Sequence, residues 1–569
     1  LYQNILNTEA RNAAGITPIQ PYLDAIDKAQ SQEELMEVSE KIYEELGASL
    51  LLGFGLAADQ KDSNHYILVF DGLYPSLGQG GYSAATATQK QAYLTYMSTL
   101  FTLVGQSETE AKAAAERVWQ TDSRLAEASL TNQDLSNVDK TYNIYTMAQL
   151  QKMFPTVDLT ALFAKTGLTQ TDRIMVQDPG RLQACADLFD PAKTAESLQV
   201  PKTYLRLGLA VGFGPALSEE FTTASNTFNQ AYMGMSGALS LEDIASQYVQ
   251  SLMSDYLGQA YISRHFSASA KADVENMVKD ILATYRNRIQ ALDWMSEATK
   301  AKAIRKLDTM KVQIGYPDTW EDSLANVPIL TIEEGGSFFE NLIAISKASQ
   351  DRMKEQQNKG VDKDRWLMTP YTVNAYYMAT SNSITFPAGI LQAPFYDEGA
   401  SKSENLGGVG YVIAHEITHA FDSNGADYDE NGDMHNWWTK ADTKAFDKRI
   451  KAFEDQWNGL EIYGTKVNGK LTVTENVADA GGLSSTLQVL KTDMTKPNLK
   501  DYFENYADIW KQKASLQYNK YTMVQDVHAP NELRVNQQLK NLPEFYEAYP
   551  QIKEGDDMYL APSKRISLW

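Results

Sequence analysis

Two histidines four residues apart, with a glutamate beside the first, occur in the stretch YVIAHEITHAFD at residues 411–422. On a helix, positions i and i+4 share a face and lie about 6 Å apart along the axis, so His415 and His419 can offer ring nitrogens to one metal ion. Glu416 points about 100° away and is better placed as a base that reaches a nearby water. The alternative is a core helix with two hydrogen-bonded histidines. Because the chain has only six histidines, the spacing favours zinc.

A zinc ion held by two histidines needs a third protein ligand. The metzincin spacing would place a histidine where Gly425 stands, and the position of the thermolysin-type glutamate is Trp438. Further along, Glu475 and Asp479 are also four residues apart, within TENVADAGG. Glu475 could complete a His-His-Glu set, and Asp479 could bond the outer nitrogen of a ligand histidine. Two solvated acids on one helical face are the alternative interpretation of this pair.

The charge and the cysteine content exclude several classes of protein. The formal net charge of −22 predicts a surface that repels nucleic acid, so we expect no nucleic-acid partner. Cys185 is the only cysteine, which excludes an intrachain disulfide and a cysteine-based zinc site. The longest apolar run, residues 48–58, is too short to span a bilayer, so we expect no membrane-spanning segment. The start at Leu1 is typical of the middle of an amphipathic helix, so we expect sequence upstream and leave open an anchor there.

The chain is too long for one compact core and changes character along its length. Apolar residues recur at helical spacing through most of the first 335 residues, with one strand signal in HYILVFDG. Residues 360–400 are richer in β-branched and aromatic residues with turn formers between them, which predicts short strands and loops. We therefore predict a mostly helical domain over residues 1–336, with possible interleaving, and a catalytic domain over residues 337–569.

Several motifs together resemble one known family. NAYY, FPAGILQAPF, VIAHEITHAFD, ENVADAGG and DVHAP followed by Arg534 occur in the order and rough spacing of the neprilysin (endothelin-converting enzyme) family of zinc endopeptidases. Upstream, LDWMSEATKAKAIRKLD and IGYPDTW are also similar to that family, so the resemblance spans nearly the whole chain. Ile566 stands where animal members carry a cysteine close to the terminal tryptophan, so the chain resembles a bacterial member.

The resemblance implies a role for each residue of the metal motif. It implies one zinc ion per chain, held by His415, His419 and Glu475. Glu416 matches the general base, which takes a proton from the attacking water and passes it to the leaving amine. Asp479 matches the acid that orients a ligand histidine. Amide hydrolysis needs an activated water, a Lewis acid on the carbonyl and a donor for the oxyanion, so these roles are chemically consistent.

Substrate contacts are also implied by the resemblance. His528 matches the residue that stabilises the oxyanion, and Arg534 matches an arginine that binds a substrate carbonyl. Without the resemblance, His528 would be read as structural and Arg534 as a surface residue. Asn374 and Ala375 match the pair that holds the peptide backbone. The pocket for the residue after the cut is matched by Ile390, Phe395, Val412, Ile509 and Trp510.

The fold and function that the resemblance implies are specific. We expect a mainly α protein with two largely helical domains enclosing a central cavity, the catalytic one gluzincin-like with a small β element. We expect a zinc-dependent endopeptidase that cuts oligopeptides on the amino side of hydrophobic residues. We also expect a monomer, in an extracytoplasmic location in a bacterium, periplasmic or surface-anchored, with the cytoplasm as the alternative.

Two other functions and one other metal site compete with this prediction. An exopeptidase on a similar zinc scaffold would need a group for the free substrate amine, and no GxMEN-like motif is present. An inactive peptide-binding protein would have lost a ligand or the base, yet all these positions are filled. Residues 427–433 begin like a calcium-binding EF-hand loop, but Trp438 stands at the twelfth position, which favours an acidic turn.

Overall fold

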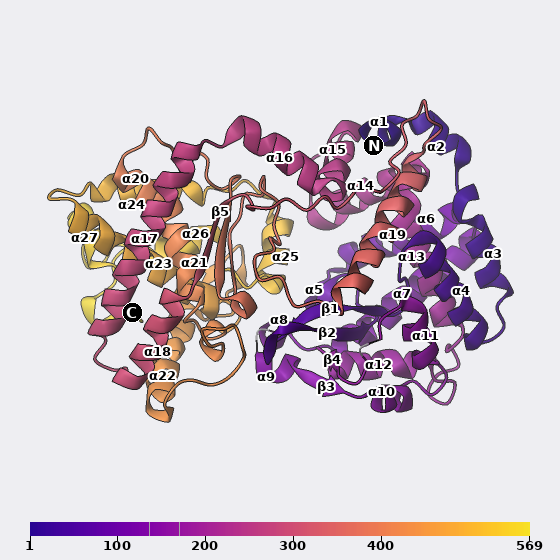
Figure 1. Cartoon of the computed structure of the whole chain (residues 1–569), viewed down its shortest axis with the longest axis horizontal. Helices are drawn as coiled ribbons and strands as arrows, with labels where there is room; N and C mark the ends of the chain where they lie inside the picture. The colour runs from indigo at the N-terminus through magenta and orange to yellow at the C-terminus, as the bar shows by residue number, and fades with distance from the viewer. Residues whose placement is uncertain (136, 170, 569) are drawn as a thin grey trace.

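The molecule has two hydrophobic cores, side by side along its longest axis (Figure 1). The computed structural model describes all residues of the chain except 136, 170 and 569. Most of the first core comes from residues 5–245, and the second comes from residues 270–314 and 375–568. The helix α19 (Phe338–Gln356) lies with the first core, through Phe338 and Phe339. The expected mainly helical fold in two parts is confirmed, whereas the boundary at residue 337 stays a prediction.

Helices with well-capped ends build most of the first part. Ser107 and Glu110 form a capping box at the start of α7 (Glu108–Ala128), and Ala111, Ala115 and Val118 bury one face of that helix at three- and four-residue spacing. The longer helices of this part are α3 (Gln20–Lys28), α4 (Gln32–Leu46), α6 (Ala87–Leu103), α7 (Glu108–Ala128), α12 (Pro179–Phe189), α13 (Gln199–Leu217) and α14 (Glu219–Met233). The helices α15 (Leu241–Leu252) and α16 (Ser254–His265) lead towards the second part along the top of Figure 1.

A four-stranded sheet in the order β1-β2-β4-β3 belongs to the first part. Its strands are β1 (Gly53–Asp59), β2 (Asp62–Gly72), β3 (Asn143–Tyr145) and β4 (Ile174–Val176). The pairs β1-β2 and β3-β4 are antiparallel, and β2-β4 is parallel. The predicted strand HYILVFDG is confirmed as part of β2.

The second part surrounds a short sheet with helices. Its helices are α17 (Ala268–Ala291), α18 (Glu297–Asp308), α21 (Tyr411–His419), α22 (Lys440–Trp457), α23 (Val473–Asp493), α24 (Leu499–Ile509), α26 (Asn531–Leu539) and α27 (Pro543–Ala548). Its sheet has the order β5-β7-β6, with β5 (Lys311–Gly315), β6 (Tyr376–Met378) and β7 (Ser383–Pro387). Among the described strands, β6 pairs with β7 alone, so it leaves one edge free for another strand. Within the described residues, no helix is both long and apolar enough to cross a lipid bilayer.

Contacts between the two parts involve the acidic turn that resembled a calcium loop. Asp433 accepts hydrogen bonds from the backbone N–H and the hydroxyl of Ser63, at 2.8 and 2.7 Å, in the hairpin end of β2. The backbone N–H of Met434 donates to the carbonyl of Gln60 at 2.6 Å. Inside the turn, Asp429 accepts from the backbone of Asn431 and Asp433. These carboxylates are engaged with backbone groups, as an acidic turn requires.

The helices α21 and α23 approach closely because glycines of α23 face α21. A Cβ added to Gly481 would lie 2.4 Å from the hydroxyl of Thr418, and one added to Gly482 would lie 3.0 Å from the carbonyl of Tyr411. Thr418 is fully buried, so it has no room to move away. The two helices carry the three predicted metal ligands together with Glu416 and Asp479, and their separation therefore sets the geometry of the site.

We predict that Gly481→Val lowers the free energy of unfolding of the metal-free protein by about 1–3 kcal/mol, because it overpacks a filled helix interface. Urea denaturation followed by circular dichroism measures the change. Gly237→Val is the control, since a Cβ there meets no atom within 4 Å. Equal stability of the two variants would contradict the inference that the helix spacing is tight.

Candidate metal centre

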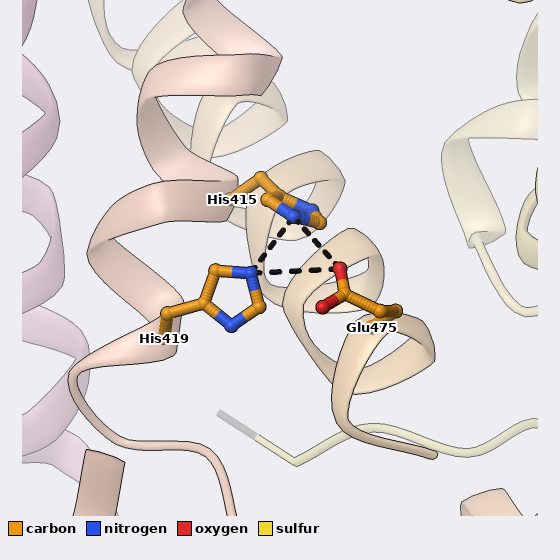
Figure 2. Close-up of side chains that lie close together, drawn as sticks. All are labelled: His415, His419 and Glu475. Atoms are coloured by element: carbon orange, nitrogen blue, oxygen red, sulfur yellow. Dashed lines mark hydrogen bonds and ion pairs between the residues drawn. The ribbon is translucent and has the colours of Figure 1, made fainter. Parts of the chain in front are cut away.

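Three side chains from α21 and α23 converge on one point (Figure 2). The Nε2 atoms of His415 and His419 are 3.0 Å apart, and they lie 3.3 and 3.5 Å from Oε2 of Glu475. Zinc ligands at about 2.1 Å from a tetrahedral ion are separated by roughly 3.4 Å. The three donor atoms therefore fit a zinc ion with only a small separation of the two imidazoles, and a tetrahedral ion would keep a fourth position for water.

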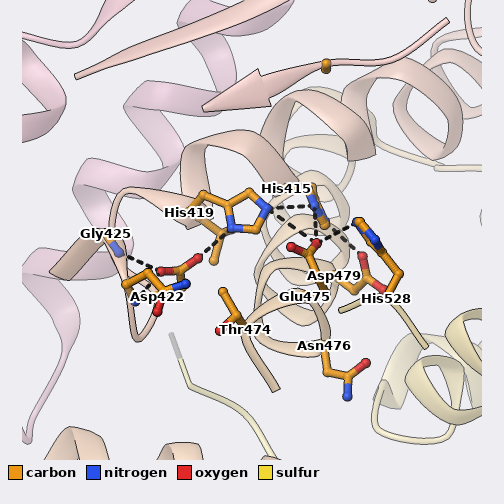
Figure 3. Close-up of polar contacts among 12 residues, drawn as sticks. His415, His419, Asp422, Gly425, Thr474, Glu475, Asn476, Asp479 and His528 are labelled. Atoms are coloured by element: carbon orange, nitrogen blue, oxygen red, sulfur yellow. Dashed lines mark hydrogen bonds and ion pairs between the residues drawn. The ribbon is translucent and has the colours of Figure 1, made fainter. Parts of the chain in front are cut away.

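Each histidine is fixed through its outer nitrogen by a buried carboxylate (Figure 3). Nδ1 of His415 lies 2.8 Å from Oδ1 of Asp479, and Nδ1 of His419 lies 2.5 Å from Oδ2 of Asp422. These bonds place a proton on Nδ1 of each ring and leave Nε2 as a lone-pair donor for a metal. Asp479 was predicted from the sequence. Asp422 was not, although its position three residues after His419 is a signal that could have revealed it.

The charges of the three converging side chains also favour a bound cation. Oε2 of Glu475 is buried and accepts no hydrogen bond from any described residue. Burial would raise the pKa of Glu475, but His419 and His528 hold it well below its usual range. Burial would lower the pKa of His419, yet Glu475 and Asp422 raise it well above its ordinary value. Bound zinc would replace the proton that the raised pKa retains on these facing imidazoles, beside an ionised carboxylate.

Arg534 extends this network behind the metal ligands. Its guanidinium donates to both oxygens of Asp479, at 2.8 and 2.6 Å, and its carbon atom Cζ lies 3.9 Å from the centre of the Trp510 ring. Tyr411 also donates to Asp479. Burial would raise the pKa of Asp479, but Arg534 holds it far below its usual range. Arg534 is thus a buried residue, not a surface one, and its Nη1 has no hydrogen-bond partner among the described residues.

His528 approaches the centre from the segment after α25 (Leu516–Gln525). Its Nε2 lies 3.1 Å from Oε2 of Glu475, and its Nδ1 lies 2.7 Å from Oδ1 of Asp526. Burial would lower the pKa of His528, but Glu475 and Asp526 raise it to about 9. The ring is therefore ready to donate a hydrogen bond beside the metal position. Sequence reasoning missed Asp526, which stands two residues before His528.

A cavity of about 550 Å³ opens over the three ligands. Glu416 lines it as a buried residue, and its carboxylate has no hydrogen-bond or ion-pair partner within the described part of the chain. Leu135 and Val138 of the first part line the same cavity, so both parts contribute to it. Asn374 and Ala375, immediately before the free edge of β6, also line it.

Most of the residues predicted for the hydrophobic pocket share this cavity. Ile509 does not line it and lies instead in the second core, adjacent in sequence to Trp510. The predicted pocket residues that do line it are Ile390, Phe395, Val412 and Trp510.

We predict that Asp422→Asn weakens zinc binding by about 10–100-fold, because the amide cannot hold His419 as the carboxylate does. Competition with a chromophoric chelator measures the dissociation constant. Asp442→Asn is the matched control, since Asp442 is an equally buried carboxylate that bonds Ser296 and Thr299 away from the metal site. If both variants bound zinc like the parent protein, Asp422 would have no role in holding the metal.

Comparisons with known proteins agree with this geometry. Sequence models of peptidase family M13 match residues 1–317 and residues 374–566. The chain is 33% identical over 576 residues to a neutral endopeptidase of Lactobacillus helveticus, covering 100% of this chain and 87% of that protein. The crystal structure of PEPO from Lactobacillus rhamnosis aligns with a TM-score of 0.92 and 31% identity, over 100% of this chain and 89% of the other.

The zinc metalloprotease ZMP1 of Mycobacterium tuberculosis, in complex with inhibitor, aligns with a TM-score of 0.91 and 29% identity, over 100% of this chain and 88% of the other. The two family matches together span both parts of the molecule. The chain therefore belongs to peptidase family M13 and is a metalloendopeptidase.

Proposed function

We propose that the protein hydrolyses oligopeptides at internal bonds, on the amino side of hydrophobic residues, with one zinc ion held by His415, His419 and Glu475. The observation that carries the proposal is the set of three donor atoms, 3.0 to 3.5 Å apart, in the same cavity as the buried Glu416. When bound there, zinc supplies a water of lowered pKa and a Lewis acid for the substrate carbonyl.

Glu416 acts as the general base of the reaction. Its carboxylate has no partner among the described residues, so it can accept the proton of the attacking water and deliver that proton to the leaving amine. Asp479 and Asp422 keep the two imidazoles in the tautomer that leaves Nε2 unprotonated. No residue other than Glu416 needs to change its protonation state for this transfer.

His528 and Arg534 donate hydrogen bonds to carbonyl oxygens of the substrate. Nε2 of His528 points at the proposed zinc site and can donate to the oxyanion as negative charge develops. Asp526 holds the ring by its other nitrogen, which fixes the direction of the donor. Nη1 of Arg534, which bonds no described residue, can donate to a substrate carbonyl while Nε and Nη2 stay on Asp479.

The substrate backbone pairs with the free edge of β6. A peptide added there gains main-chain hydrogen bonds, with Asn374 and Ala375 immediately before that strand. The apolar side chains around the cavity then receive the residue after the cut. Burying such a side chain is worth roughly 1.5–3 kcal/mol, which sets the size of the preference.

We predict that Glu416→Gln lowers the turnover number at least about 100-fold while zinc binding stays intact, because the change removes a base but no ligand. Glu475→Gln is the counterpart and should weaken zinc binding instead. Steady-state kinetics on an internally quenched peptide, with metal content measured in parallel, tests both. Near-normal turnover in Glu416→Gln would disprove the assigned base.

Cleavage of a mixed library of terminally blocked peptides should show an about tenfold to hundredfold preference for Phe or Leu just after the cut. Phe395→Ala should reduce that preference, because Phe395 lines the cavity. Leu367→Ala is the control, since Leu367 is an exposed apolar residue outside it. Failure to cut any blocked peptide would favour an exopeptidase, and binding without cleavage would favour an inactive peptide-binding protein.

A further inference from the structure

Lys306 of α18 is a buried cation directed at the segment that follows the ligand helix. Its side chain is 1% exposed. The Nζ atom donates to the backbone carbonyls of Ala420, Gly425 and Tyr428, at 2.9, 2.6 and 2.7 Å. No carboxylate of the described residues lies within ion-pairing distance of Nζ. An ammonium group has three donors, so these three carbonyls satisfy it completely.

The three acceptors belong to one loop, residues 420–428, which begins where α21 ends at His419. Carbonyls at a helix C-terminus carry partial negative charge and lack intrahelical donors, so a cation stabilises them. Removing a buried ammonium from water is costly, and burial lowers the pKa of Lys306 to about 7 although Asp422 and Asp429 oppose the shift. The three carbonyl hydrogen bonds offset part of this cost and tie the ammonium group to the loop.

The loop holds Asp422 between the carbonyls that Lys306 binds. Oδ1 of Asp422 accepts from the backbone N–H groups of Asn424 and Gly425, both at 2.7 Å, and Oδ2 bonds His419. Gly425 packs so closely on the helix end that an added Cβ would lie 1.8 Å from the carbonyl of His419. Lys306 therefore fixes both flanks of the carboxylate that orients a metal ligand.

The backbone of Lys306 is tied to the strand that borders the cavity. Its carbonyl accepts from Nδ2 of Asn382 at 2.9 Å, and Oδ1 of Asn382 accepts from the hydroxyl of Tyr377 at 3.2 Å. Asn382 lies between β6 and β7 and has a φ of 46°, which its side-chain hydrogen bonds support. One end of α18 thus joins the ligand loop to the sheet.

We propose that Lys306 is a positioning residue for the metal centre, acting through the 420–428 loop to hold Asp422 against His419. The proposal rests on the zinc site of the proposed function. It predicts that loss of the ammonium group loosens His419 as a ligand even though Lys306 touches neither the metal position nor the substrate cavity.

The test compares Lys306→Met with Lys300→Met in the full chain. Methionine keeps most of the length of lysine and removes the charge. Lys300 lies on the same helix, is 8% exposed, and donates to the carbonyl of Gln290 and to Glu297, at 3.0 Å each. The readouts are the zinc dissociation constant by chelator competition and the melting temperature of the metal-free protein.

We expect both variants to melt earlier, but only Lys306→Met to bind zinc about 10–100-fold more weakly. In an Asp422→Asn background, Lys306→Met should weaken zinc binding little further, because Lys306 acts on His419 through Asp422. Unchanged zinc affinity in Lys306→Met, or a loss that Lys300→Met matches, would overturn the proposal. If Lys306→Met does not fold, Lys306→Arg replaces it: a guanidinium cannot place one nitrogen among three carbonyls, so unchanged affinity there would also overturn it.

The wild-type protein separates this inference from the proposed function. Absence of zinc binding or of peptide hydrolysis in the wild type would end the proposed function itself. Normal binding and hydrolysis in the wild type, with unchanged zinc affinity in the Lys306 variants, would end only the role of Lys306.

Discussion

The close contact of α21 with α23 is the constraint on which the site depends. The first helix carries the two histidines and Glu416, and the second carries Glu475 and Asp479. Gly481 and Gly482 let the backbones approach, so that Glu475 and Asp479 reach opposite nitrogens of the imidazole of His415. A wider spacing would move the imidazole of His415 away from both buried acids, and the loss of hydrogen bonds between buried polar groups is costly.

A carboxylate fixes each of the three imidazoles around the candidate metal position. Asp479 holds His415, Asp422 holds His419, and Asp526 holds His528. Arg534 compensates the charge of Asp479, the deepest of these acids. The arrangement keeps each imidazole in one tautomer and one orientation, so binding a metal requires little rearrangement of the protein.

The sequence predicts the parts of this site that follow helical periodicity. His415 with His419, and Glu475 with Asp479, are visible because positions four apart share a helix face. Lys306 and the carbonyls it binds are more than a hundred positions apart in the chain. The sequence also does not indicate which backbone carbonyls act as acceptors. Arg534 seemed a surface residue for a similar reason, since its partner Asp479 is 55 positions away. The packing of α19 against the first core could not be predicted either. Helical periodicity identifies an apolar face but not the element that packs against it.

The position of His528 depends on both parts of the molecule, because α25 is attached to the first part just before it. Ser515, at the start of α25, donates to the carbonyl of Met233, and Asn132 donates to the carbonyl of Gln525 at its end. The three candidate metal ligands, in contrast, all come from the second part. A displacement of one part relative to the other would therefore move His528 away from Glu475 while leaving the three ligands together. The three candidate ligands are positioned within one core, whereas the position of His528 beside Glu475 also depends on contacts with the first part.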